Sequence, residues 1–321
     1  MASDAGINLA VREVRTGPLQ GGRPAIILLH GARVAGIPSF DLPVPHGSLA
    51  ADLAVAGYRI FIMDARGYDG STRIGQDGDC TGNPLVRSDE VVRDVDAAVT
   101  AVKARTGLSN IALLGWATGG HWVGMYASRH PHQASHVIIY NSLYGGHAGH
   151  KILASGGPLS DPKDPTRFDI GKSGAYGFNT AASLTPSWDA SIPVEDKTTW
   201  RDAAVLEAYQ RNALASDPTS NQRVPPSFRA PMGAIADSFE LASGRKLWDA
   251  ATIAARVLII RSGNDFWSRP EDLVDLQHDL IRARSVRAVT IPDATHYVHL
   301  DRPERGRNLL MKEVLEFLAE A

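Results

Sequence analysis

Hydrophobic residues along the chain form short continuous runs that are separated by amphipathic stretches. Four runs in the first half are predicted to be buried strands, at residues 25–30, 58–64, 111–116 and 136–142. Such near-continuous hydrophobicity is typical of parallel strands covered on both faces of a sheet. Helical periodicity fills residues 48–57 and 89–107 between them. The first of these helices begins with a potential capping serine, Ser48, and the second ends in basic residues followed by glycine.

The same alternation of strand and helix returns near the C-terminus. Strand-like runs at 256–265 and 286–293 alternate with helical patterns at 269–280 and 304–321. This repetition predicts an α/β fold with a mostly parallel, doubly wound sheet and right-handed crossovers.

Residues 143–251 interrupt this rhythm. They are rich in Gly, Pro, Ser and Asp and contain only short helical pieces, at 198–214 and 231–248. Three tryptophans in the interval favour a packed structure over a disordered linker: Trp188, Trp200 and Trp248. We therefore expect a core formed by residues 1–142 and 252–321, with residues 143–251 inserted as a cap, or lid, over one end of the sheet.

Composition and charge narrow the class of protein. The net charge of −2 over 321 residues favours neither nucleic acid nor an anionic membrane as a partner. The first residues lack the basic start and apolar run of a signal peptide, and no run approaches the roughly 18 apolar residues of a membrane span. The single cysteine, Cys80, excludes an internal disulfide and is expected to be a surface thiol. A cytoplasmic location is expected.

The stretch NIALLGWATGGHWVG, residues 110–124, runs from a strand-like segment through a glycine-flanked turn into a helix-like segment. Residues 115–119 fit the pattern G-x-S-x-G in every position except the serine, which is replaced by Ala117. In that pattern a sharp strand-to-helix turn holds its central residue in strained backbone geometry. A purely structural turn would favour glycine at this point, so the strain favours a position built for a nucleophile.

On these residues the sequence resembles the α/β-hydrolase fold family, and the resemblance covers nearly the whole chain outside the inserted interval. The family order is nucleophile, then acid, then histidine. The nucleophile position matches Ala117, the acid matches Asp265 in LIIRSGNDFWSRPED, and the base matches His296 in IPDATHYVHLDRPE. Some members carry the acid after the preceding strand, but IIYNS at that place contains no carboxylate.

The resemblance implies a role for each position. His296 would remove the proton of a serine hydroxyl, and Asp265 would hold its imidazole and stabilise the charged form. Two backbone N–H groups would bind the oxyanion of the tetrahedral intermediate, those of Thr118 and Ala32. The implied reaction is hydrolysis of an ester, lactone or thioester of a small organic substrate through an acyl-enzyme. Amide or carbon–carbon bond hydrolysis and acyl transfer stay open.

Ala117 has three explanations: a deliberate Ser→Ala substitution that inactivates the enzyme, a natural ligand-binding pseudoenzyme, or replacement of an Asp or Cys nucleophile. The retained Asp265 and His296 favour the first of these, because a drifting pseudoenzyme has no need to keep both. The chain as it stands is expected to be almost inactive.

Five residues close to these elements in the sequence are expected to bind substrate: Arg33, Trp116, His121, Tyr144 and Trp267. Packing beneath the insertion is an equally open role for Trp116, His121, Tyr144 and Trp267. No metal or organic cofactor is expected; His147 and His150 lack a carboxylate or cysteine that would complete a metal site. The expected partner is a small-molecule ester or lactone, with no nucleic acid and no membrane, and a homodimer is compatible with the sequence.

Overall fold

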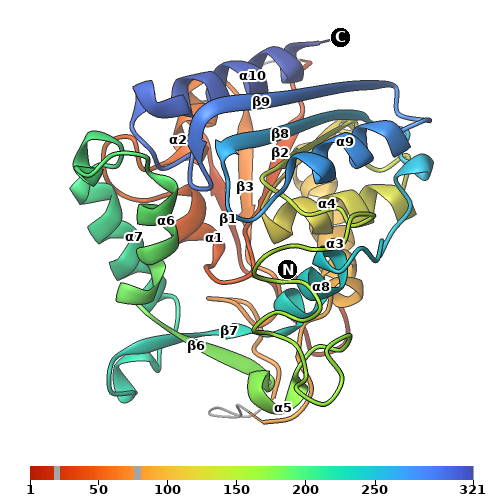
Figure 1. The fold of residues 1–321 in the computed structure, drawn as a ribbon. Helices are drawn as coiled ribbons and strands as arrows, with labels where there is room; N and C mark the ends of the chain where they lie inside the picture. The colour runs from red at the N-terminus through yellow and green to blue at the C-terminus, as the bar shows by residue number, and fades with distance from the viewer. Residues whose placement is uncertain (18–21, 76–80, 321) are drawn as a thin grey trace.

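The computed structural model describes residues 1–17, 22–75 and 81–320. A twisted sheet forms the centre of the molecule, with helices on both faces (Figure 1). Cys80, predicted as a surface thiol, lies outside the described residues. In the part of the chain that is described, no helix is long and apolar enough to cross a membrane.

Seven strands form the central sheet in the order β1-β3-β2-β4-β5-β8-β9. Only β1 pairs antiparallel with its neighbour, and the other pairs are parallel. The predicted doubly wound, mostly parallel sheet is confirmed. The strands span Val11–Val14 (β1), Ala25–Leu29 (β2), Arg59–Met63 (β3), Ile111–Trp116 (β4), His136–Tyr140 (β5), Arg256–Asn264 (β8) and Ser285–Thr295 (β9).

Two apolar layers hold the helices against the sheet. One layer lies under α3 and α4 and includes Val95 and Trp122, and the other lies under α2 and α10 and includes Leu53 and Phe317. The helices of the core are α1 (Gly36–Phe40), α2 (Leu49–Val55), α3 (Ser88–Thr106), α4 (Thr118–Arg129), α9 (Pro270–Asp279) and α10 (Asn308–Ala319).

The ends of two of these helices follow the sequence signals. Ser48 accepts a hydrogen bond from the backbone N–H of Ala51 and so caps α2. Gly107 ends α3 in the left-handed conformation, with φ of 71°, which glycine adopts without a steric penalty. Both signals predicted from the sequence are present in the structure.

The interval for which the sequence predicts a cap contains both short helices and a small sheet. Strands β6 and β7 pair antiparallel, and Trp188 and Trp200 are buried, as packing requires. The elements are α5 (Ile170–Ser173), β6 (Tyr176–Thr180), η1 (Ala182–Leu184), α6 (Pro186–Ser191), η2 (Lys197–Thr199), α7 (Ala203–Ala215), η3 (Ser220–Gln222), β7 (Ser227–Pro231), α8 (Gly233–Ala242) and η4 (Ala250–Thr252).

The two ends of this interval pack differently. Side chains of α6 and α7 join the same apolar layer as α2 and α10, whereas Ala234 of α8 and Trp248 join the layer under α3 and α4. In Figure 1, α6 and α7 stand at one side of the sheet and α8 lies near the start of α3. That residues 143–251 form a domain of their own stays a prediction.

Two glycines allow β4 to turn into α4 at Ala117. A Cβ on Gly115 would lie 2.2 Å from the carbonyl oxygen of Gly119, and a Cβ on Gly119 would lie 2.3 Å from the carbonyl oxygen of Leu29 in β2. Because both obstacles are backbone atoms, neither can move aside alone. The spacing of the two glycines is therefore fixed by the close approach of β2, β4 and α4.

We predict that Gly119→Ala destabilises the protein by about 3 kcal/mol or more, at the upper end of the cost of overpacking. Gly171→Ala in α5 is the matched control, because the nearest atom to its Cβ would be Asp169 Oδ1 at 3.5 Å. The control should change the free energy of unfolding by less than about 1 kcal/mol. Urea denaturation measures both, and equal effects would contradict a packing requirement at the turn.

Candidate functional site

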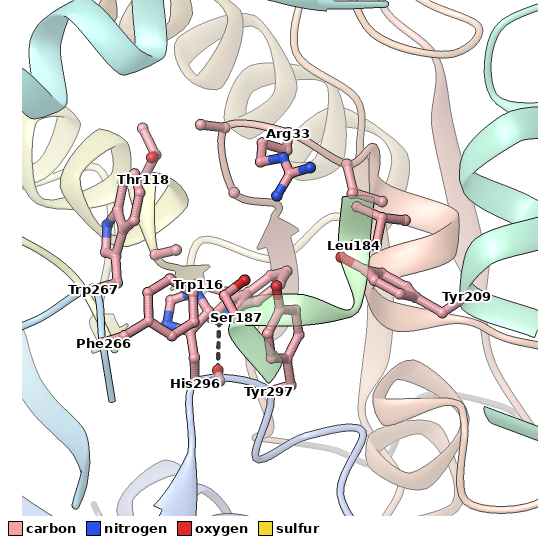
Figure 2. Close-up of a pocket in the computed structure, with 14 residues that line it drawn as sticks. Arg33, Trp116, Thr118, Leu184, Ser187, Tyr209, Phe266, Trp267, His296 and Tyr297 are labelled. Carbon is pink, nitrogen blue, oxygen red and sulfur yellow. Dashed lines mark hydrogen bonds between the residues drawn. The ribbon is translucent and has the colours of Figure 1, made fainter. Parts of the chain in front are cut away.

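Three residues far apart in the sequence meet at the carboxyl ends of parallel strands. Ala117 directly follows β4, Asp265 follows β8 and His296 follows β9. The imidazole Nδ1 of His296 donates a hydrogen bond to Oδ1 of Asp265 over 2.6 Å. Ala117 and His296 line one cavity (Figure 2). The carboxyl edge of an α/β sheet is where such sites form.

The carboxylate of Asp265 is held by the backbone that follows it. Oδ1 accepts from the N–H of Trp267 at 3.0 Å, and Oδ2 accepts from the N–H of Ser268 at 2.9 Å and from the Ser268 hydroxyl. Burial alone would raise the pKa of Asp265, but the His296 charge and these hydrogen bonds outweigh it and lower the pKa. Asp265 is therefore an ionised acceptor for Nδ1–H, which leaves Nε2 of His296 to accept a proton.

The position of His296 is set through its backbone. Its carbonyl oxygen accepts hydrogen bonds from the indole of Trp116 and the side-chain amide of Asn141, each at 3.0 Å. The imidazole contacts the rings of Trp116 and Phe266, with centroids 5.1 Å and 4.7 Å away. Trp116 thus both lines the cavity and fixes the loop that carries the histidine.

The loop that carries His296 is also tied to the cap. Asp301 accepts hydrogen bonds from the indole of Trp188 in α6 at 2.8 Å and from the hydroxyl of Thr295 at 2.6 Å. Burial raises the pKa of Asp301 to about 7, against the effect of these bonds. Helix α6 and the histidine loop are therefore joined by a buried polar contact.

The backbone of Ala117 is strained. Its φ of 53° and ψ of −119° are unusual for a residue with a Cβ. The N–H of Ala117 donates to the carbonyl of Tyr140 in β5, and the carbonyl of Ala117 accepts from the N–H of Gly120, both at 3.0 Å. The sequence-predicted turn therefore has the backbone geometry of a nucleophile position, and the side chain at its tip is a methyl group.

A buried histidine orients the peptide between Gly31 and Ala32. Nδ1 of His30 donates to the carbonyl of Gly31 at 2.7 Å, and its Nε2 accepts from the N–H of Ala65 at 3.2 Å. Burial lowers the pKa of His30 to about 4, so the ring is neutral. In a trans peptide the N–H points opposite to the C=O. Since the carbonyl turns towards His30, the N–H of Ala32 is turned away from it, and Ala32 lines the cavity.

Thr118 provides a second amide at the same cavity. It is the first residue of α4, where the N–H groups have no partner within the helix and the helix dipole is positive. Its hydroxyl is buried and has no hydrogen-bond partner among the described residues. The two backbone groups predicted for an oxyanion thus belong to residues that line one cavity (Figure 2).

The cavity holds about 90 Å³, several times the space of one water molecule. Of the residues predicted to bind substrate, Arg33, Trp116 and Trp267 line it. Sequence reasoning missed several other lining residues: Val34, Leu184, Ser187, Tyr209, Phe266 and Tyr297. Phe266 and Tyr297 adjoin Asp265 and His296 in the sequence, which could have identified them. The residues from the cap carry no motif.

His121 does not line the cavity, so the prediction that it binds substrate is not supported by its place in the structure. Its Nε2 bonds to the hydroxyl of Ser88 at 2.9 Å, and that hydroxyl donates to Asp237 of α8 at 2.6 Å. Its Nδ1 accepts from the indole of Trp248 at 3.0 Å. The His121 side chain therefore joins α4 to α3 and α8, because it leaves α4 on the face that packs against them.

Tyr144 also lies away from the cavity. Its hydroxyl donates to Asp279 at 2.6 Å, and the ammonium of Lys246 lies 5.1 Å from its ring centre. The two histidines considered as metal ligands, His147 and His150, have other contacts. His150 bonds through Nε2 to the carbonyl of Trp267 at 3.0 Å, and His147 lies 3.6 Å from Asp275. Over the described ranges, no group of three or more His, Cys, Asp or Glu could hold a metal ion.

Comparisons with known proteins agree on the fold. A family model described as the alpha/beta hydrolase fold matches residues 24–170. A search of the curated proteins finds no match. The chain is similar to the enol-lactonase from Burkholderia xenovorans LB400, with 18% identity, a TM-score of 0.56, and coverage of 100% of this chain and 99% of that chain.

Two further solved structures are similar over almost their whole length. For an esterase from Rhodococcus sp. ECU1013 the identity is 17% and the TM-score 0.60, covering 99% of this chain and 97% of that chain. For a serine-to-alanine mutant of the meta-cleavage product hydrolase from Pseudomonas fluorescens IP01, complexed with acetates, the identity is 16% and the TM-score 0.59. That match covers 98% of this chain and 94% of that chain.

We predict that His121→Gln weakens the dependence of stability on pH. Burial lowers the pKa of His121 to about 4, although the charge of Asp237 opposes this. Below pH 6.5 the unfolded chain binds a proton that the folded chain does not, so His121 lowers stability as pH falls from 6.5 towards 4. The free energy of unfolding of the parent should fall relative to the variant by about 1.4 kcal/mol per pH unit in this window.

Urea denaturation at several pH values between 4.5 and 7.5 measures this difference. Ser88→Ala is the control, because it removes a hydrogen bond from the same network without removing the titrating ring. The control should lower stability by a similar amount at every pH. Parallel curves for the parent and His121→Gln would show that His121 does not titrate as a buried neutral group.

Proposed function

Because this chain belongs to the α/β-hydrolase fold family, we propose that its site is built to hydrolyse a carboxylic ester, lactone or thioester through an acyl-serine, with Ala117 at the position of the serine. The observation that carries the proposal is the hydrogen-bonded pair of His296 and Asp265 beside the strained backbone of Ala117. Backbone strain at a turn beside an aligned base and acid is explained when the residue at the tip of the turn is a nucleophile that they activate.

The reaction follows from the positions of the groups. With serine at position 117, Nε2 of His296 takes the hydroxyl proton while the oxygen attacks the carbonyl carbon. The N–H groups of Ala32 and Thr118 bind the resulting oxyanion. His296 then returns the proton to the leaving oxygen or sulfur as that bond breaks. A water molecule, deprotonated by His296, attacks the acyl-serine and releases the acid and the free serine.

A second candidate function is ligand binding without turnover, and the methyl group of Ala117 favours it. The side chain at the tip of the turn has no atom that could form the acyl bond, while the cavity and the oxyanion groups are retained. For the chain with Ala117, we propose substrate or product binding with almost no hydrolysis.

Restoring the hydroxyl tests the two candidates. Ala117→Ser should raise hydrolysis of short p-nitrophenyl esters or lactones by at least about a thousandfold, since loss of a triad nucleophile costs orders of magnitude. Steady-state rates measure the gain. Ala117→Gly, which changes the backbone preference without adding oxygen, is the matched control and should gain nothing.

Adding His296→Ala or Asp265→Asn to Ala117→Ser should remove most of the gain. If Ala117→Ser hydrolyses none of these compounds and yet binds them, the ligand-binding function is supported instead.

His30 is proposed as a positioning residue for the oxyanion group at Ala32. In the Ala117→Ser background, His30→Phe removes the donor to the Gly31 carbonyl and should lower kcat by about a hundredfold, the cost of one oxyanion donor. KM should change little, because the group acts on the charge formed in the transition state. His30→Asn keeps a donor near Nδ1 and should recover part of kcat. Equal losses in kcat for both variants, or a loss confined to KM, would contradict this role.

A further inference from the structure

Arg33 brings a positive charge into the wall of the cavity. It follows Ala32 directly, and Figure 2 shows its guanidinium among the side chains that line the cavity. Its Nε donates to the side-chain carbonyl of Asn179 at 2.9 Å, and its Nη2 donates to the backbone carbonyl and the hydroxyl of Ser183 at 3.1 Å and 2.9 Å. All three acceptors are neutral, and both residues belong to the cap.

Three other arginines with little exposed surface are paired with carboxylates, whereas Arg261 and Arg305, half-buried like Arg33, donate to backbone carbonyls. Arg66 lies 2.6 Å from Asp94, Arg269 lies 2.8 Å from Asp272 and Arg307 lies 2.6 Å from Asp52. Among the described residues, no carboxylate lies within 4 Å of the Arg33 guanidinium, and its Nη1 makes no hydrogen bond. An unpaired charge in a partly desolvated wall is costly, so this site favours an anion supplied by the ligand.

The charge of Arg33 acts on the side chains around the reaction centre. Burial raises the pKa of Tyr209 and of Tyr297, and in each case the nearby charge of Arg33 opposes the rise. Tyr297 follows His296 directly, and both tyrosines line the cavity. Phe266 and Trp267, on the loop after β8, supply apolar surface in the same cavity. The cavity thus offers a cationic group beside aromatic surface, within electrostatic reach of the catalytic position.

We propose that Arg33 binds a free carboxylate on the substrate, so that the natural substrate is a short acyl compound with a second, ionised acid group, such as a half-ester of a small dicarboxylic acid. The hydrolysis of such a substrate rests on the proposed function, whereas the binding of its carboxylate by Arg33 does not. Nη1, the guanidinium nitrogen without a partner among the described residues, can donate a charge-assisted hydrogen bond to a carboxylate. Ala32 and Arg33 line the same cavity of about 90 Å³, which favours a short substrate.

The chain with Ala117 allows binding to be measured without hydrolysis. We expect calorimetry to show monomethyl succinate binding more tightly than dimethyl succinate, and its affinity to fall as salt is raised. Arg33→Gln should weaken binding of the half-ester at least tenfold and leave the diester unchanged. Monomethyl malonate, glutarate and adipate extend the series, and inorganic phosphate tests whether any small anion suffices.

Two controls separate the charge from its surroundings. Ser183→Ala removes the hydroxyl that accepts one of the two Nη2 hydrogen bonds, but it keeps the backbone acceptor and the charge. It should leave the preference for the half-ester in place. Arg15→Gln removes an arginine of the same type whose side chain is 59% exposed, and should change nothing. Arg33→Lys keeps the charge but loses the Nε and Nη2 donors that fix the side chain to Asn179 and Ser183, and should retain part of the preference. Thermal denaturation confirms that each variant is folded.

Turnover in the Ala117→Ser background separates the two proposals. A higher kcat/KM for the half-ester than for the diester, reversed by Arg33→Gln, supports both. Half-ester binding that depends on Arg33 without hydrolysis supports the carboxylate site and contradicts the hydrolase. Hydrolysis of neutral esters with no preference for any half-ester and no effect of Arg33→Gln overturns the carboxylate site alone. The carboxylate site is also overturned if phosphate binds as tightly as the half-esters. It is overturned as well if none of the half-esters binds.

Discussion

The strained backbone at Ala117 is the constraint on which the geometry of the site depends. Its positive φ is held from both sides, by the N–H bond to Tyr140 in β5 and by the tight contact of Gly115 with Gly119. The neighbouring strands then determine what faces the tip. Since β8 and β9 follow β5 across the sheet, their ends bring Asp265 and His296 to the same edge. The backbone of the sheet therefore sets the direction in which the side chain at position 117 leaves the main chain.

Much of the core could be predicted because burial on both faces leaves a simple pattern. Strands β2, β4 and β5 are completely buried, and each appears in the sequence as a continuous apolar run. Strand β1, Val11–Val14, has no such run, because it lies at the edge of the sheet and none of its residues is fully buried. Strand β6, Tyr176–Thr180, has only one buried residue and mixes two aromatic residues with glycine and polar residues, so it has no continuous apolar run either. Short edge strands are stabilised by contacts with neighbouring strands, and these contacts cannot be identified from the local sequence.

Some residues of the candidate site could likewise be predicted from the sequence, and others could not. Ala117, Asp265 and His296 could be assigned because the resemblance gives the order nucleophile, acid, histidine, and each of the three lies at or shortly after the end of a predicted strand. His121 and Tyr144 were assigned by proximity along the sequence alone. At about 1.5 Å per residue, His121 lies almost one turn further along α4 than Thr118, and its ring bonds to Ser88 of α3 instead of entering the cavity. Tyr209 enters the cavity from the cap, where neither periodicity nor spacing indicates which face of α7 turns inward.

The anchoring of Arg33 has a consequence for motion. The guanidinium belongs to the loop after β2, but its hydrogen-bond acceptors, Asn179 and Ser183, belong to the cap. Any displacement of β6 and η1 relative to the sheet must break these bonds and release the arginine. An anion that binds the ordered guanidinium would then favour the arrangement in which these hydrogen bonds are formed, and that arrangement would strengthen anion binding by the same free energy. The charge of the ligand and the placement of β6 and η1 would be thermodynamically linked.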